Sequence, residues 1–518
     1  MIECGCNRSR LMMQSNLKTT VAKNASANLV RLVGSGFVAV LLPAFLVRRL
    51  SIDTYSAWAL LLQWTAYLSF LDFGVQTAVA RFVAHANELD NPGERNGIAS
   101  TAFALLTAAS SLGLVLVGLA AWQLPHIFSG MPAQLHCEAR IALMLMGGSF
   151  ALGLPISVVH AIFIGLQRNE LPMAIMLINR GVMAGLVIVA ALQHRGLAAM
   201  GAGVASANCL SYAISYFAWH KMAPHIHIQN SLVERTYFKQ IGGYCAATAI
   251  WLAGTLMVSG LDLTIVGIFD YSATAYYAVA ATLTNFVAQA QGAIFAALLP
   301  ASAVLAARSD GKGLGGMLLS STRYGMLILL AMGLPLMLAG NWILRTWVGN
   351  SYASRSTLIL QVLLVANVIR LCALPYATLL LGTGQQRKVI LSPLAEGITN
   401  IAASILGAYL FGAIGVAIGT LIGSFVSVGL HLFYNMPRTS FIAIDRLLLV
   451  RQGLLRPLLC AAPVALILLF RATIPILSLG ALSLLVLIGS LMGTIFLFWQ
   501  YGLLGYEREK LGQVLRIS

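Results

Sequence analysis

The sequence is dominated by long apolar runs that contain no Asp, Glu, Lys or Arg. Three of these runs are Ile98–Pro125, Ile141–Gln167 and Tyr271–Ala307, and a fourth, Gly397–Pro437, has 41 residues. A helix needs about 20 apolar residues to cross a bilayer, so the fourth run holds two helices. Only 9% of the 518 residues are charged, against roughly 25% in soluble domains. The composition excludes a cytosolic enzyme and a disordered chain, and predicts a polytopic membrane protein.

Apolar runs bounded by charges and turn residues predict fourteen membrane-spanning helices. They are expected near residues 28–47, 54–72, 99–121, 141–165, 172–192, 197–219, 241–267, 274–300, 324–344, 356–381, 389–411, 413–435, 455–474 and 476–500. The predicted fold is therefore an all-α polytopic bundle. The longest expected loop, residues 73–98, is too short for a folded domain, so function is expected within the helices or at their ends.

The distribution of Lys and Arg predicts the orientation of the chain. Fourteen spans place both termini on one side, and 22 of the 32 Lys and Arg residues then lie on that side, with 7 on the other and 3 within spans. Positive residues concentrate in cytoplasmic loops, so both termini are expected in the cytoplasm. The same bias accounts for the net charge of +16 without any nucleic acid as a partner.

The two halves of the chain repeat at an offset of about 216–219 residues. The matched positions are Asp53 with Asp270, Gly74 with Gly292, Asn91–Glu94 with Ser309–Lys312, Gly165–Arg168 with Gly384–Arg387, Arg180-Gly181 with Glu396-Gly397, and Gly196 with Gly412. Six helices per repeat is an even number, which predicts two parallel six-helix lobes around a central cavity. The expected segments are residues 1–27 (cytoplasmic tail), 28–219 (first lobe), 220–240 (linker), 241–435 (second lobe), 436–454 (linker), 455–500 (helices 13 and 14) and 501–518 (cytoplasmic tail).

Several short motifs resemble a known family of membrane transporters. They are Tyr55–Trp58, Leu71–Gly74 and Ala80–Phe82 in the first half, and Leu261-Asp262, Tyr276–Ala280, Trp347–Gly349, Tyr352-Ala353 and Gly382–Arg387 in the second. Together they are similar to the bacterial polysaccharide (O-antigen, exopolysaccharide) flippases of the multidrug/oligosaccharidyl-lipid/polysaccharide (MOP) exporter superfamily. The resemblance covers roughly residues 28–435.

This resemblance implies a function and a location. It implies alternating access between two lobes, with an undecaprenyl-pyrophosphate-linked oligosaccharide as the substrate and the bacterial inner membrane as the site of action. Membrane lipids, a glycan polymerase and glycosyltransferases are the partners that such a pathway implies. A drug or small-molecule exporter of the same superfamily and an integral-membrane glycan polymerase or ligase are the alternatives.

Basic residues within or beside the spans are the first candidates for a substrate site. A charge at bilayer depth costs at least about 2.5–3.5 kcal/mol, so it needs a partner or an aqueous cavity. Arg180 and Arg370 lie within spans, and a guanidinium binds phosphate through two parallel hydrogen bonds. We expect them to bind the pyrophosphate, with structural pairing to Glu396 or Asp262 as the alternative. Arg31 and Arg81 are weaker candidates, because long side chains near helix ends reach the membrane surface.

Acidic residues within the spans are the candidates for coupling. Glu396, Asp262 and Asp72 are expected either to bind a coupling proton or sodium ion or to form charge pairs. Asp72 becomes central if the second helix continues through Arg81. Helix 1 carries no acid between Leu32 and Val47, which disfavours the drug/cation antiporters that often place one there.

No motif for catalysis, a cofactor or a structural metal is present in the sequence. It lacks the phosphate-binding loop G-x-x-x-x-G-K-[ST], the H-E-x-x-H motif and the nucleophile elbow, so we expect a transporter and not an enzyme. His225 and His227 lie in a basic loop, where solvation is the expected state. The positions Gly415, Gly419 and Gly423 repeat every four residues and predict close packing of helix 12.

Overall fold

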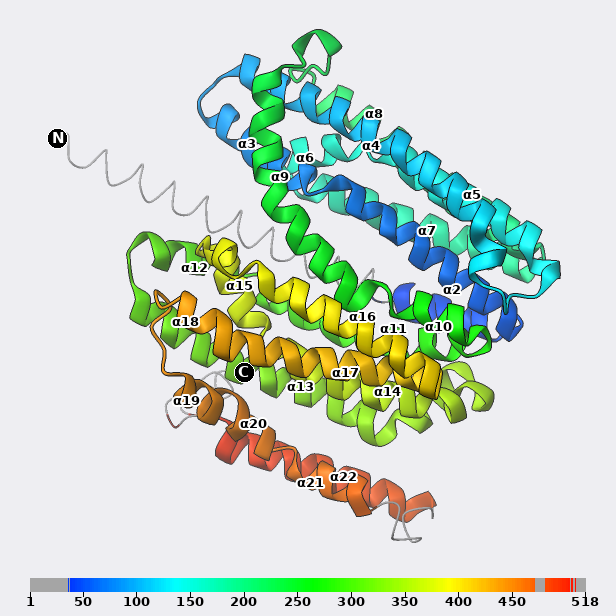
Figure 1. Ribbon diagram of the computed structural model, residues 1–518, viewed down its shortest axis with the longest axis vertical. Coiled ribbons are helices and arrows are strands. Elements are labelled where there is room, and N and C mark those ends of the chain that lie inside the picture. The colour runs from blue at the N-terminus through cyan, green and yellow to red at the C-terminus, as the bar shows by residue number, and fades with distance from the viewer. Residues whose placement is uncertain (1–35, 37, 471–479, 504, 506–507, 509–518) are drawn as a thin grey trace. The chain divides into compact units, whose positions relative to one another are not determined.

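The computed structural model describes residues 36, 38–470, 480–503, 505 and 508. The regular secondary structure of the described residues consists of helices joined by turns and loops (Figure 1). In the first half they are the Val38–Val47 helix, α2 (Ile52–Tyr67), α3 (Val75–Glu88), α4 (Pro92–Ile127), α5 (Ala133–Gly153), α6 (Ser157–Gly165), α7 (Glu170–Leu192), α8 (Gly196–Met222) and α9 (Arg235–Thr255). In the second half they are α10 (Asp262–Phe269), α11 (Thr274–Phe295), α12 (Leu298–Ala307), α13 (Gly311–Val348), α14 (Asn350–Leu371), α15 (Leu374–Gly382), α16 (Leu391–Phe411), α17 (Ala413–Leu430), α18 (Met436–Arg438), α19 (Arg446–Leu448), α20 (Arg456–Leu459), α21 (Ala462–Phe470) and α22 (Gly480–Leu497).

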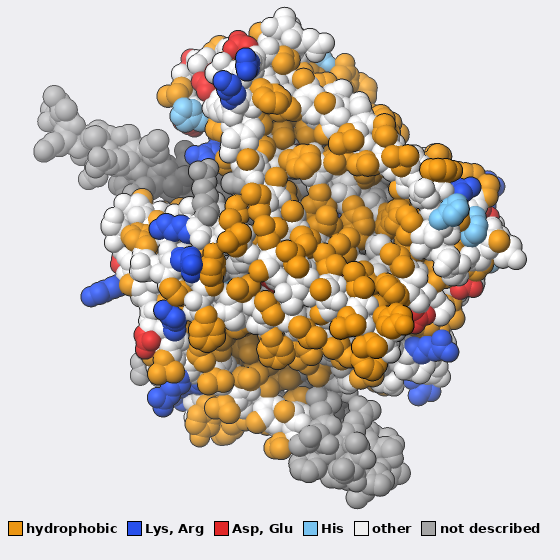
Figure 2. Space-filling model, viewed as in Figure 1, with side chains coloured by type: hydrophobic (Ala, Val, Ile, Leu, Met, Phe, Trp, Pro, Cys, Tyr) orange, Lys and Arg blue, Asp and Glu red, His pale blue; other side chains and the backbone are white. Residues whose placement is uncertain are grey.

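The all-α polytopic architecture is confirmed. Among the described residues, 10 helical segments are long and apolar enough to cross a membrane, and they coincide with the third to twelfth predicted spans. Large apolar side chains point outward along them, for example Tyr409 (78% exposed) and Trp122 (63% exposed). In Figure 2 hydrophobic side chains cover the middle of each half, and most charged side chains lie towards the helix ends. Lipid is the solvent that suits such a surface. Predicted spans 1, 13 and 14 fall partly outside the described residues.

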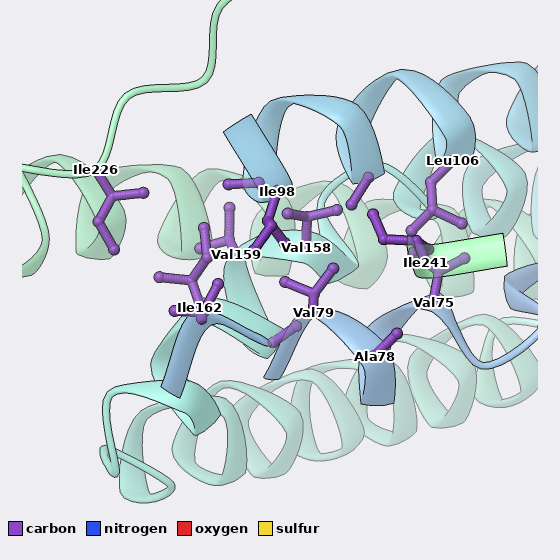
Figure 3. Close-up of a cluster of buried hydrophobic side chains, with 14 of the residues drawn as sticks. Val75, Ala78, Val79, Ile98, Leu106, Val158, Val159, Ile162, Ile226 and Ile241 are labelled. Atoms are coloured by element: carbon purple, nitrogen blue, oxygen red, sulfur yellow. The ribbon is translucent and has the colours of Figure 1, made fainter. Parts of the chain in front are cut away.

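The chain divides into two compact units, Met1–Ala253 (unit 1) and Gly254–Ser518 (unit 2). The boundary lies inside α9. Ile241 and Cys245, near the start of α9, belong to the hydrophobic cluster of unit 1, where Ile241 lies among the side chains of α3, α4 and α6 (Figure 3). Near the other end of α9, Gly254 packs against Pro393 of α16. The first half of α9 is therefore part of the core of unit 1.

The duplication predicted from the sequence is visible in the neighbours of each helix. The packed pairs α4–α5, α5–α8, α7–α8 and α3–α6 in unit 1 correspond to α13–α14, α14–α17, α16–α17 and α12–α15 in unit 2. Equivalent caps begin the two longest helices: Asn91 accepts from the backbone N–H of Glu94 at the start of α4, and Asp310 accepts from Gly313 at the start of α13. Asp90 and Ser309, which precede these caps, both have positive φ.

The prediction that residues 73–98 form a loop is wrong, because most of this segment is helical. Helix α2 ends at Tyr67, a 3-10 turn runs from Leu68 to Asp72, and α3 occupies Val75–Glu88. Val75, Ala78, Val79, Val83 and Ala86 form the buried face of α3, at the i, i+3, i+4 spacing of an amphipathic helix. Polar residues on the opposite face lower the mean hydropathy of this segment, which concealed the helix from a reading of apolar runs.

The predicted close packing through small residues holds for α16 and α17. A Cβ added at Gly415 would overlap the backbone of Gly407, and one at Gly419 would meet the backbone of Ser404. These glycines let the two helix backbones touch, and dispersion contacts between backbones replace the hydrophobic driving force that lipid removes.

The Gly415→Leu protein is expected to accumulate less in the membrane and to unfold at a lower temperature. The new side chain would push α16 and α17 apart, and overpacking of this kind costs about 1–3 kcal/mol or more. Gly429→Leu is the matched control, since a Cβ at Gly429 on the same helix meets nothing within 4 Å. The measurements are membrane abundance and the thermal midpoint in detergent. Equal values for the two variants would contradict the packing argument.

Candidate functional site

Three predicted site residues come together within unit 2. Asp262 begins α10, Arg370 lies near the end of α14, and Glu396 lies on α16. α10 packs on both α16 and α17, and α14 packs on α17. The positive charge of Arg370 acts on the carboxylates of both Asp262 and Glu396. We call the group formed by these three side chains and their hydrogen-bond partners the unit 2 polar cluster.

Asp262 is the most strongly held member of the unit 2 polar cluster. It is 8% exposed. Its Oδ2 accepts hydrogen bonds from Thr420 Oγ1 at 2.9 Å and from Tyr277 Oη at 3.2 Å. Its Oδ1 is buried and has no hydrogen-bond partner among the described residues. A buried carboxylate oxygen without a donor is costly, so this atom is suited to receive a proton or a cation.

Glu396 and Arg370 are also engaged by neutral side chains. Ser427 Oγ on α17 donates to Glu396 Oε2 at 2.7 Å. Arg370 Nη2 donates to Asn367 Oδ1 at 3.1 Å, and Asn367 Nδ2 in turn donates to the carbonyl of Thr284 at 3.1 Å. The guanidinium is therefore anchored on its own helix by Asn367 while its charge acts on the acids of neighbouring helices.

Asn400 lies one helical turn beyond Glu396 on α16 and is 1% exposed. Both its Oδ1 and its Nδ2 are buried without a partner among the described residues. The absence of a side chain at Gly423 leaves it room, because a Cβ there would lie 3.0 Å from the Cβ of Asn400. An amide buried with both polar atoms unsatisfied implies a ligand or water that the protein is built to hold.

The predicted residues of unit 1 do not form a cluster of this kind. Arg180 lies in the middle of α7 with an exposed side chain, and its guanidinium has no hydrogen-bond partner in the described part of the chain. Arg81 on α3 is exposed and lies over the ring of Tyr244 at 5.7 Å. Asp72 ends the 3-10 turn before α3 and accepts from the backbone N–H of Gln76 at 3.2 Å. Arg31 lies outside the described residues.

Unit 1 contains a cavity of about 490 Å³, which we call the unit 1 cavity. It lies where α5 gives way to α6 around Pro155, and α7 and α8 complete its wall. Gly153, at the end of α5, allows Tyr212 of α8 to lie against the helix backbone, because a Cβ at this position would overlap the Tyr212 side chain. Its lining includes the amides Gln76, Asn169, Asn179 and Asn208, the hydroxyls Ser157, Ser211 and Tyr212, and His160.

The loop histidines show no metal-binding arrangement. His225 and His227 are exposed, and the described residues contain no group of three or more His, Cys, Asp or Glu side chains suited to hold a metal ion. Partial burial, with the nearby charges of Arg95, His227 and Arg168, lowers the pKa of His225 below its usual value. At neutral pH His225 is therefore mainly uncharged.

Sequence reasoning missed the neutral polar members of these sites. Tyr277, Thr420 and Ser427 in unit 2 donate hydrogen bonds to two acids that the sequence did identify, and Asn400 lies one turn beyond one of them. The sequence did contain a signal for them, because an amide side chain within an apolar span costs free energy in lipid unless it forms hydrogen bonds or binds a ligand. Asn179, Asn208 and Asn400 all satisfy that criterion.

The fold is shared with solved transporter structures. An inward-facing multidrug resistance MATE family transporter of the MOP superfamily superimposes with a TM-score of 0.67 at 14% identity, over 80% of this chain and 98% of that one. The lipid II flippase MurJ, in an inward closed conformation, gives a TM-score of 0.66 at 12% identity, over 92% of this chain and 98% of that one. The chain has the fold of MOP superfamily transporters.

A second MATE structure, in the straight conformation, gives a TM-score of 0.59 at 14% identity over 82% of this chain and 96% of that one. No protein-family model matches the sequence, and no curated protein resembles it significantly. The likeness at these identities concerns the MOP fold alone.

Proposed function

We propose that this protein is a flippase that moves an undecaprenyl-pyrophosphate-linked oligosaccharide across the bacterial inner membrane by alternating access. The observation that carries the proposal is the extent of the fold match to the lipid II flippase. That match covers 92% of the chain, so it includes part of residues 455–518, which make up more than a tenth of the sequence. The multidrug transporter match covers 80%. The sequence motifs that resemble polysaccharide flippases support the same substrate class.

Arg180 is the residue that we assign to the pyrophosphate. An exposed guanidinium within a membrane span, with no hydrogen-bond partner in the described chain, keeps all its donors for a ligand. Arg370 fits this role less well, because Asn367 accepts one of its hydrogen bonds and its charge already acts on two carboxylates. Arg81 and Arg31 remain secondary candidates for the same anion.

The unit 2 polar cluster is the proposed coupling site. Asp262 Oδ1 is a carboxylate oxygen that is buried without a partner among the described residues, and a proton or a sodium ion would satisfy it. Asn400 Oδ1, also unsatisfied, is a second candidate oxygen ligand on α16. The charge of Arg370 acts on both acids, so the charge state of Glu396 would affect how strongly Asp262 binds a cation. Asp72 takes part in capping α3, which favours a structural role.

Deletion of the gene, with complementation by the cloned gene, tests the proposed function. Lipid-linked glycan is expected to accumulate in the cytoplasmic leaflet, and surface polysaccharide is expected to fall to a small fraction of the wild-type amount. The measurements are leaflet-specific labelling of the lipid-linked glycan and quantification of surface polysaccharide.

Two other outcomes would replace the proposal. Unpolymerised glycan on the periplasmic side would identify a polymerase or ligase. Unchanged surface glycan together with increased sensitivity to organic cations would identify a drug exporter. Glycosyltransferase genes beside this gene would support the flippase, whose substrate such enzymes build.

A further inference from the structure

The lining of the unit 1 cavity combines a larger apolar surface with polar side chains. No Asp, Glu, Lys or Arg occurs among the described residues that line it. A cationic drug would find no counter-charge here, and an isolated phosphate would find no cation on the wall itself. A volume of about 490 Å³ lies within the range of small-molecule sites. The wall therefore suits an uncharged ligand that has both an apolar surface and hydrogen-bonding groups.

Amide side chains provide most of the hydrogen-bonding capacity. Asn179 Nδ2 donates to Asn208 Oδ1 at 3.1 Å, and Asn208 Nδ2 donates to Ser149 Oγ at 3.0 Å. An amide has two N–H donors and an acceptor with two lone pairs, so this chain fixes the orientation of both side chains and leaves further donors and acceptors on each. Sugar hydroxyl groups also both donate and accept, which matches such a wall.

Ser211 is an independent sign that the cavity is built for a ligand. It lines the cavity and is 6% exposed, and its Oγ is buried without a hydrogen-bond partner among the described residues. Its neighbour on the next turn of α8, Ser215, is fully engaged, since it contacts His160 Nε2 at 2.9 Å and donates to the carbonyl of Ser211 at 2.8 Å. A buried hydroxyl without a hydrogen-bond partner is costly, and a ligand hydroxyl that reached this Oγ would satisfy it.

Apolar side chains, aliphatic and aromatic, form the rest of the lining. Phe150, Tyr212 and His160 are the ring-bearing residues of the lining, beside aliphatic side chains such as Met173 and Ile175. Tyr212 is held in place by its Oη, which donates to the carbonyl of Ser149 at 2.9 Å. Rings beside convergent polar groups suit the two-sided character of a pyranose, which has an apolar C–H face and a rim of hydroxyls.

We propose that the unit 1 cavity binds an uncharged pyranose unit. The proposal rests on the proposed function only for the source of the sugar, which would be the glycan of the transported lipid. Arg180 follows Asn179 in α7 but points about 100° further around the helix, and it is not among the described residues that line the cavity. With the orientation predicted from the charge bias, the cavity lies in the cytoplasmic half of unit 1, where loading would occur.

The binding test uses the purified full-length protein in lipid nanodiscs with methyl β-glucoside and N-acetylglucosamine as free probes. Saturation-transfer NMR is expected to show transfer to the ring protons of at least one probe. Asn179→Leu and Asn208→Leu keep the side-chain volume and remove the hydrogen bonds, so each is expected to weaken binding about tenfold. Asn341→Leu is the matched control, an exposed amide on α13 in unit 2 that is expected to bind like wild type.

A second arm separates the glycan of the lipid from a free sugar. The same variants are assayed for surface polysaccharide and for membrane abundance in cells. Loss of probe binding together with loss of export, at normal abundance, supports the proposal. Loss of probe binding with normal export would mean that the cavity binds a free sugar, which would overturn the lipid-linked glycan as the source. If the wild-type protein bound neither probe, the proposal of a pyranose site would itself be overturned. Neither result touches the flippase function, which the gene deletion tests by itself.

Discussion

The Arg180→Ala protein is expected to lose most glycan export, at least about tenfold, while it accumulates in the membrane at the wild-type level. The exposed guanidinium of Arg180 has no hydrogen-bond partner in the described chain, so its removal leaves no buried acceptor unsatisfied. A pyrophosphate bound by this side chain would lose a charge-assisted pair of hydrogen bonds. Arg180→Lys is expected to keep partial export, because it retains the charge and loses the planar fork.

Surface glycan and membrane abundance, measured side by side, check this prediction. Arg195→Ala is the matched control, an exposed arginine in the turn before α8 on the side opposite to the predicted cytoplasmic one. Normal export by an abundant Arg180→Ala protein would remove Arg180 from the substrate site. A fall in abundance would instead mean that Arg180 is a structural partner, since breaking a buried ion pair costs about 3–5 kcal/mol. A double variant with Glu396→Ala would then identify or exclude Glu396 as that partner.

The Asp262→Asn protein is expected to be normally abundant and to transport at least about tenfold more slowly. Asparagine has the same shape, and its Oδ1 can still accept from Thr420 and Tyr277, as Asp262 Oδ2 does. It cannot provide the negative charge that a coupling proton or sodium ion requires. Binding of a cation by the folded protein raises its stability by about 2.7 kcal/mol when the cation is present at 100 times its dissociation constant.

The check is a thermal unfolding series in detergent, with sodium against N-methylglucamine and across pH. The unfolding temperature of the wild-type protein is expected to rise in the presence of the coupling ion, and that of Asp262→Asn is expected to stay the same. Asp90→Asn serves as the control, because Asp90 is an exposed acid in the turn before α4. Unchanged transport by Asp262→Asn would end the coupling hypothesis. Low abundance restored by Arg370→Gln would establish charge pairing between Asp262 and Arg370 in its place.

Local features of the sequence determined the fold class. The length of an apolar run and the absence of charge report the cost of placing that segment in lipid, which is a property of the segment alone. For this reason ten of the fourteen predicted spans coincide, among the described residues, with helical segments long and apolar enough to cross a membrane. The matched turns Asn91–Glu94 and Ser309–Lys312 were recognised for the same reason, since each is a local feature. The structure adds that Asn91 and Asp310 within them are N-caps.

Tertiary structure decided which charged residues face one another and which do not. Thr420 lies 158 residues from Asp262, and no periodicity in the sequence pairs them. Arg180 and Arg370 were equivalent as arginines within spans. The fold leaves the first exposed, whereas the second donates to Asn367 and its charge acts on two acids. Hydropathy measures how much a residue costs in lipid and not the direction in which its side chain points. That direction depends on helix packing, which also brings Asn179, Asn208 and Ser211 to one cavity.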